Sequence, residues 1–383
     1  MKPFLRPINI PTTEYEALQA LARECLDGCR LVAADGTVLF RPDGSGHYNA
    51  LWTRDFCYMV EGAGHLMEPA EILAAIDYLL AGQREDGVIP DRRQADGTSV
   101  YMVGGAANPI GADVPTDNAQ FLIKAVAAYV RLTGDRQAFL DRRNALYRAI
   151  DSVPLSEDLL VYVDPNRAHP AYGFTDCIAK TGKELFTTLL YWEALQTLAQ
   201  LCARAEYHDE AHEWYERAEN TARRMGDFWD DSVGMFYAAT QDCHQIDLWG
   251  SLYAAVIRAA SKSQTARVAE YLTQWWDECV YEGHLRHLRA GEYWRRLLID
   301  VAPDTYQNGG YWATPSGWLI QTIGVEDDLA ARRLVVTLLE EFTAHGVHEW
   351  ISPQERRLPG YVASIANVLG AVQPSRKLEP LSD

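Results

Sequence analysis

Two acidic residues stand in sequence surroundings that suit proton transfer. Asp176 ends the run Tyr172-Gly173-Phe174-Thr175-Asp176, and Glu349 lies among apolar neighbours in Val347-His348-Glu349-Trp350-Ile351. Apolar surroundings raise the pKa of a carboxyl group, and acid–base hydrolysis needs one protonated and one ionised carboxyl at the same pH. At this level a helix cap for Asp176 and a solvated loop acid for Glu349 explain the two residues at least as well.

The stretch 304–318 combines three kinds of residue that bind sugar rings: flat aromatic faces, paired amides and glycines that allow close backbone approach. A tight turn whose aromatics fill the core is the alternative for any single residue. We favour ligand binding for the cluster, because an amide pair between aromatics and glycines is an unusual composition for a plain turn. The members are Tyr306, Gln307, Asn308, Gly309, Gly310, Tyr311, Trp312 and Trp318.

Helices must position these residues, because apolar residues recur at helical spacing along most of the chain. The ranges are 14–27, 52–67, 70–80, 118–132, 135–150, 183–203, 209–228, 248–260, 265–279, 311–323, 326–344 and 361–370. Short strand-like pieces at 37–40, 159–163 and 234–238 lie in or beside the long links.

The links between these helices alternate between short and long. Short joints such as Glu68-Pro69 and Gly134-Asp135 alternate with long segments rich in Gly, Pro, Asp and aromatics. This alternation predicts an all-α fold, an (α/α)6 toroid of six helical hairpins with the more apolar helices inside. Because no linker or composition shift divides the chain, we expect one catalytic domain over residues 1–383.

In such a toroid the long links open at one mouth, where a small-molecule site is expected. Several polar or aromatic residues begin or precede inner helices. The residues expected to bind substrate there are Trp52, Arg54, Asp55, Asp117, Trp249, Gln307, Asn308, Gly309, Tyr311 and Trp312. Arg54 and Asp55 could instead form a structural ion pair at a helix start.

Composition excludes several classes of partner. The formal net charge is −18, which argues against nucleic acids and acidic membranes. No apolar run has the roughly 18 residues of a membrane span, and the seven scattered cysteines are expected to be free thiols. A cytoplasmic protein is therefore predicted. His208 and His212 lack the glutamate placement of a zinc helix, and no phosphate loop occurs, so neither a metal nor another cofactor is expected.

The chain resembles the six-hairpin glycosidases, which include neutral/alkaline invertases, glucoamylases, trehalases, debranching glucosidases and glucosylglycerate hydrolases. The resemblance covers most of the chain as an ordered series, and the Asn-Gly-Gly-Tyr-Trp element and the run 288–294 are most similar to the invertase branch. The series is Trp52-Thr53-Arg54-Asp55-Phe56, Gly87-Val88-Ile89-Pro90, Thr116-Asp117-Asn118, Phe174-Thr175-Asp176, Asp247-Leu248-Trp249, Tyr306-Gln307-Asn308-Gly309-Gly310-Tyr311-Trp312 and His348-Glu349-Trp350.

That resemblance implies inverting hydrolysis of a small carbohydrate, with α-glucosides as the expected class. Asp176 would be the general acid and Glu349 the general base, with carboxyl groups about 6.5–9.5 Å apart. Asp176 follows Phe-Thr rather than standing beside a tryptophan as in several relatives, so Asp117 is the reserve acid. The distance from Glu349 to the run Gly360-Tyr361-Val362 is similar to that in glucoamylases and invertases.

Two other functions are compatible with the same fold. A sugar isomerase or epimerase would use histidines such as His287 or His348 beside a carbonyl, and a sugar-binding relative would have no chemistry. Two separated carboxylates without a matched histidine pair favour hydrolysis. Ring stereochemistry, substrate chain length and oligomeric state do not follow from the sequence.

Overall fold

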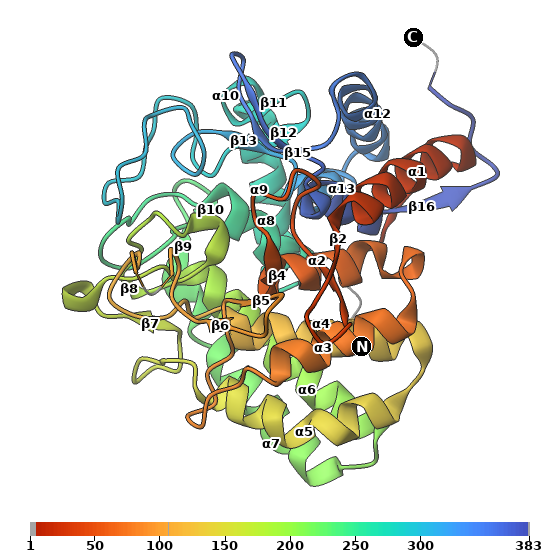
Figure 1. Ribbon diagram of the computed structural model, residues 1–383. Helices are drawn as coiled ribbons and strands as arrows, with labels where there is room; N and C mark the ends of the chain where they lie inside the picture. Colours follow the sequence, from red (N-terminus) through yellow and green to blue (C-terminus); the bar gives the residue numbers. More distant parts are fainter. Residues whose placement is uncertain (1–4, 106, 382–383) are drawn as a thin grey trace.

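A computed structural model describes residues 5–105 and 107–381, and Figure 1 shows helices packed side by side with short strands in their connections. The prediction of a helix-rich fold is confirmed. The helices are α1 (Thr12–Cys29), α2 (Thr53–Ala63), α3 (Pro69–Leu80), α4 (Asn118–Thr133), α5 (Arg136–Asp151), α6 (Leu185–Arg204), α7 (His208–Ala222), α8 (Leu248–Val256), α9 (Lys262–Gln274), α10 (Trp276–Cys279), α11 (Ser316–Ile323), α12 (Asp328–His345) and α13 (Val362–Gly370). The ends of the domain predicted over residues 1–383 lie outside the described residues.

The most deeply buried helices contact one another in a closed order. Helix α2 contacts α4, and the contacts continue through α6, α8, α11 and α13 back to α2. Every residue of α8 and of α11 is buried, whereas α7 buries only Trp214, Ala218 and Thr221. Helices with apolar residues all round need neighbours on every side, and charged ones such as α7 need only one covered face.

The two ends of the described chain meet. Strand β1 (Ile8–Pro11) pairs in parallel with β16 (Val372–Ser375), with Ile8 opposite Val372. Helix α1 packs against α12 and α13, and Figure 1 shows this early red helix beside the late blue elements. The pairing joins segments that precede the first helix and follow the last.

Short strands occupy the connections. The three predicted strand pieces correspond to β3 (Val38–Phe40), β7 (Tyr162–Val163) and β10 (Met235–Phe236). An antiparallel sheet with the order β11-β12-β13-β14-β15 was not expected from the sequence; its strands are β11 (Val280–Tyr281), β12 (His284–Leu285), β13 (Tyr311–Trp312), β14 (His348–Ile351) and β15 (Arg356–Pro359). The others are β2 (Arg30–Val32), β4 (Ala50–Trp52), β5 (Arg92–Gln94), β6 (Ser99–Val100), β8 (Gly182–Lys183) and β9 (Trp229–Asp230).

Several helix predictions were wrong in their bounds. Those over 52–67, 209–228 and 248–260 extend past the ends of α2, α7 and α8, and two others differ in more than their last residues. The helix expected from Tyr311 begins at Ser316, because Tyr311 and Trp312 form β13 opposite Ile351 and Trp350. Pro315 accounts for the late start, since a proline disfavours helical geometry in the residue before it. The helix expected over 265–279 is divided at Trp275 into α9 and α10. Over residues 5–105 and 107–381, the helices are too short or too polar to cross a membrane.

A buried ion-pair network ties four of the inner helices together. Lys124 Nζ on α4 lies 2.9 Å from Glu193 Oε2 on α6 and 3.4 Å from Glu61 Oε2 on α2. It also lies 2.5 Å from the hydroxyl of Tyr253 on α8, which donates to Glu193. Lys124 has 3% side-chain exposure, so its charge depends on these partners rather than on water.

Replacing Lys124 with methionine is expected to lower the free energy of unfolding by about 3–5 kcal/mol, because it leaves buried carboxylates unpaired. Chemical denaturation measures the change. The double variant Lys124→Met/Glu193→Leu should recover part of the loss, since it also removes the uncompensated charge. Equal losses in both variants would mean that packing, rather than charge pairing, sets the effect.

Candidate active site

The two carboxylates singled out from the sequence line one pocket. Asp176 directly follows the 3-10 turn η3 (Gly173–Thr175), and Glu349 lies on β14. The pocket is lined by Pro42, Tyr48, Trp52, Arg54, Asp55, Gly173, Phe174, Asp176, Tyr306, Gln307, Trp312, Glu349 and Tyr361. These residues come from connections that lead into α2, α6, α11 and α13, or from the first turn of α2, so separate parts of the chain build the site.

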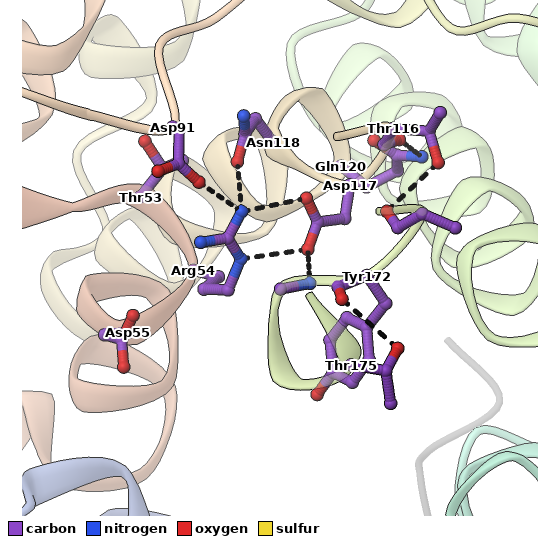
Figure 2. Close-up of polar contacts among 12 residues, drawn as sticks. Thr53, Arg54, Asp55, Asp91, Thr116, Asp117, Asn118, Gln120, Tyr172 and Thr175 are labelled. Carbon is purple, nitrogen blue, oxygen red and sulfur yellow. Dashed lines mark hydrogen bonds and ion pairs between the residues drawn. The ribbon is translucent and has the colours of Figure 1, made fainter. Parts of the chain in front are cut away.

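Arg54 anchors one side of this pocket (Figure 2). Its Nε donates to Asp117 Oδ2 at 3.0 Å, and one terminal nitrogen donates to Asp91 Oδ1 at 2.6 Å and to Asn118 Oδ1 at 3.1 Å. The ion pair considered between Arg54 and Asp55 was therefore the wrong pairing. Because the guanidinium is planar with donors in a fixed fork, it holds several acceptors at set angles.

Arg54 and Asp117 also position the turn that carries Asp176. The backbone N–H of Gly173 donates to Asp117 Oδ2 at 2.9 Å. A Cβ at Gly173 would lie 1.8 Å from Arg54 Nε, so any side chain there would displace the guanidinium. Asp117 is fully buried and lies behind Arg54, outside the residues that line the pocket.

Burial raises the pKa of both carboxyl groups in the pocket. For Asp176 it raises the pKa to about 7, against the opposing effects of the Arg54 charge and a hydrogen bond from Gln307. For Glu349 burial raises the pKa well above its ordinary value, the negative charges of Asp55 and Asp176 add to the rise, and a hydrogen bond from Tyr48 opposes it. The negative charge of Asp176 is thus one of the effects that favour a proton on Glu349.

Asp55 is a third acidic group in the pocket. It accepts a hydrogen bond from the Tyr361 hydroxyl at 2.6 Å, and burial raises its pKa to about 6. The cavity enclosed by the lining has a volume of about 30 Å³, which is enough for a water molecule.

Comparison with solved structures identifies the fold. A rhamnosidase from Klebsiella oxytoca with rhamnose bound is similar over 96% of this chain and 65% of its own, with a TM-score of 0.68 and 11% identity. A GH63 mannosylglycerate hydrolase from Thermus thermophilus in complex with glucose is similar over 92% of this chain and 99% of its own, with a TM-score of 0.67 and 16% identity.

The chain shares its fold with these two glycoside hydrolases. A further structure, of a protein described as a glycosidase, matches 95% of this chain and 98% of its own, with a TM-score of 0.63 and 14% identity. No protein-family model matches the sequence, and no curated protein matches it. This chain matches 65% of the length of the rhamnosidase chain, slightly less than two thirds.

The sequence did not single out Tyr48, which also lines the pocket. Its hydroxyl donates to Glu349 Oε1 at 2.8 Å. The Asp43 carboxylate shapes the loop that presents Tyr48, accepting from the backbone N–H groups of His47 and Tyr48 at 3.1 and 2.9 Å. A sequence feature that could have indicated this loop is Asp43 followed by the small residues Gly44, Ser45 and Gly46. This composition is typical of a turn capped by an aspartate side chain.

Replacing Tyr48 with phenylalanine is expected to move the acidic limb of the kcat/KM profile to higher pH. The hydroxyl donates to the ionised form of Glu349, so its loss raises the pKa of Glu349, and a base acts only above its pKa. A hydrogen bond to a charged group contributes about 1.5–3 kcal/mol, equivalent to about one to two pH units. Tyr215→Phe, at an exposed position, is the control, and an unchanged acidic limb in Tyr48→Phe would contradict the expectation.

Some of the residues predicted from the sequence to bind substrate line the pocket, and others lie outside its lining. Trp52, Arg54, Asp55, Gln307 and Trp312 line it together with the two carboxylates. The remaining candidates, Asp117, Trp249, Asn308, Gly309 and Tyr311, lie outside its lining.

Each of these outer residues supports the fold around the site. Trp249 is fully buried and stacks on His287 with ring centroids 3.9 Å apart. Asn308 Oδ1 accepts from the Trp294 N–H at 3.0 Å, and its Nδ2 donates to the Val301 carbonyl. Gly309 has a φ of 127°, which a side chain would strain. Some residues of the aromatic and amide cluster therefore line the pocket, and others support the backbone around it.

Proposed function

We propose that this protein is an inverting glycoside hydrolase of small glycosides or oligosaccharides, with α-glucosides as the first class to test. The observation that carries the proposal is a pair of acidic groups of raised pKa in one pocket, within a fold shared with glycosidases. Asp176 protonates the glycosidic oxygen, and Glu349 takes a proton from the water that attacks the opposite face of the ring.

The surroundings of the carboxylates support this division of roles. Asp117, the reserve acid, accepts hydrogen bonds from Arg54 and from the Gly173 N–H, which suits a structural role. The Tyr48 hydroxyl donates to Glu349, which favours the ionised form that a base requires and opposes the rise in pKa that burial causes. The separation of about 6.5–9.5 Å expected for inverting enzymes stays a prediction for Asp176 and Glu349.

A sugar isomerase or epimerase is less well supported. His287 stacks on Trp249 and His348 bonds through Nδ1 to the Gly346 carbonyl, and neither histidine is among the residues that line the pocket. Proton transfer beside a carbonyl would need such a group within hydrogen-bond reach of the substrate. A sugar-binding relative without chemistry remains the outcome if no glycoside is cleaved.

The proposal also covers the fold, the domain organisation, the cellular compartment and the partner of the enzyme. The closed contact order of α2, α4, α6, α8, α11 and α13 supports an (α/α)6 toroid, which we propose as a single catalytic domain over residues 1–383. All seven cysteines are buried free thiols, which supports a reducing compartment such as the cytoplasm. A small carbohydrate is the proposed partner, and no cofactor is invoked.

Product configuration tests the proposal. The wild-type protein is incubated with α- and β-glucosides, rhamnosides and mannosylglycerate, the last two because similar structures carry those names. Proton NMR then follows the first anomer released. Hydrolysis of an α-glucoside to the β-anomer supports the proposal. Release of the α-anomer, formation of an isomerised sugar, or no cleavage of any glycoside would overturn it.

A further inference from the structure

One carboxamide reaches both ends of the turn that presents Asp176. Gln307 Oε1 accepts from the backbone N–H of Cys177 at 3.0 Å and from the Cys177 thiol at 3.0 Å. Gln307 Nε2 lies 3.4 Å from the Gly173 carbonyl, to which it donates. The segment 173–177 is therefore held from its first residue to its last by a single side chain.

The turn needs such support because no helix holds Asp176. The 3-10 turn η3 ends at Thr175, and α6 begins at Leu185. The intervening chain is held by short ladder contacts, such as β8 with β7 and the bridge between Ile178 and Leu297, and further along by a hydrogen bond from the Thr181 hydroxyl to Asp242. Asp117 holds the start of the turn through the Gly173 N–H. At its far end Cys177 donates to Gln307 and accepts from the backbone N–H of Leu298 at 2.8 Å.

Gln307 is itself held rigidly. It is 1% exposed, and its backbone carbonyl accepts from Trp294 Nε1 at 3.0 Å. The loop around it is tight, with Tyr306 at a φ of 43° and bridges from Thr305 to Asn308 and Gly309. A rigid support transmits its position to what it holds, which is how residues behind a site preorganise a catalytic group.

The Cys177 thiol, which donates to the Gln307 carboxamide, keeps its proton. Burial raises the pKa of the Cys177 thiol, so the thiol stays protonated and can donate to Gln307. Both polar ends of the carboxamide thus have protein partners in the unliganded site. An amide that is already engaged in this way is poorly placed to exchange its partners for sugar hydroxyls, which was the role first expected of Gln307.

We propose that Gln307 is a positioning residue for Asp176, clamping the turn 173–177 so that its carboxyl meets the glycosidic oxygen. This rests on the proposed function of Asp176 as general acid. Misplacement of a catalytic group by about 1 Å costs on the order of 100-fold in rate. Loss of the clamp therefore affects the step that needs a proton from Asp176, and leaves water activation by Glu349 intact.

The first test compares leaving groups in Gln307→Met, which keeps the length of the side chain and removes both hydrogen-bonding atoms. We expect kcat to fall about 100-fold on glycosides with poor leaving groups, with a much smaller fall on glycosyl fluorides, whose leaving group needs no proton. Gln373→Met, the same change at an exposed position on β16, is the matched control. A rise in KM with unchanged kcat would indicate sugar contact and overturn the proposal, as would equal losses on both substrate classes.

The second test measures Asp176 directly, by carbon-13 NMR titration of its carboxyl in the wild type and in Gln307→Met. Because the Gln307 carboxamide opposes the rise in the pKa of Asp176, the variant should titrate at higher pH. An unshifted titration would overturn the proposal. A shifted titration in a protein that cleaves no glycoside would leave the clamp standing and overturn the proposed function instead.

A second variant, Gln307→Glu, tests the same proposal if Gln307→Met does not fold. The glutamate retains the acceptor for the Cys177 N–H, loses the donor to the Gly173 carbonyl and adds a negative charge near Asp176. We expect the alkaline limb of kcat/KM to move to higher pH, because a nearby like charge raises a carboxyl pKa. An alkaline limb at the wild-type position would count against the clamp.

Discussion

Replacing Glu349 with glutamine is expected to lower kcat by about 100- to 10,000-fold on natural and activated glycosides alike. Glutamine is nearly isosteric and still accepts a hydrogen bond from Tyr48, but it cannot take a proton from water. The attacking water is therefore unactivated whatever the leaving group is. Steady-state kinetics on a disaccharide and on the corresponding glycosyl fluoride measures both losses.

Azide provides the complementary observation for Glu349→Gln. A small anion can enter the space beside the neutral amide and attack from the face that water uses, so turnover should return as a glycosyl azide of inverted configuration. Glu355→Gln, in the same link but paired with Arg357 near the surface, is the matched control and should retain activity. Full activity in Glu349→Gln would remove Glu349 from the mechanism.

Replacing Asp176 with asparagine is expected to lower kcat by about 100- to 10,000-fold on substrates with poor leaving groups, because the proton donor is lost. The loss should shrink on glycosyl fluorides, since fluoride departs without a proton from Asp176. The alkaline limb of the wild-type profile should also be missing from the variant, because the proposed mechanism assigns the ionisation that ends activity at high pH to Asp176, whose pKa burial raises to about 7.

Asp117→Asn separates the two candidates for the acid. Asp117 accepts from Arg54 and from the Gly173 N–H, so its neutral variant should lose stability and show no dependence on the leaving group. If Asp117→Asn, with an unchanged melting temperature, shows that dependence and Asp176→Asn does not, the acid is Asp117. Equal losses for Asp176→Asn and Glu349→Gln on both substrate classes would mean that the assigned roles are wrong.

Local sequence was sufficient for most of the helices. The ranges expected at 118–132 and 183–203 correspond to α4 (Asn118–Thr133) and α6 (Leu185–Arg204). Gly134, with a φ of 75°, ends α4 as a glycine does at a helix C-terminus. Helical periodicity and such stop signals are properties of neighbouring residues, so they can be read without knowing what the helix packs against.

The strands of the sheet β11–β15 could not be read in the same way. Each is only two to four residues long, too short to show a period. Tyr311 and Trp312 become a strand because Ile351 and Trp350 lie opposite them. A pairing between segments so far apart in the chain depends on the closure of the helices around them, and local propensity does not contain it.

The sequence by itself determined which residues are candidates for the site and where most helices lie. The candidates are the acidic residues at 176 and 349 and the aromatic and amide run near 307. Both conclusions depend only on residue type and local order. Tertiary structure decided which polar groups meet. Arg54 could have paired with its neighbour Asp55, but it pairs with Asp91 and Asp117, 37 and 63 positions away. Partners for a buried charge are chosen by the distance and burial that packing imposes, and those exist only after the helices have assembled.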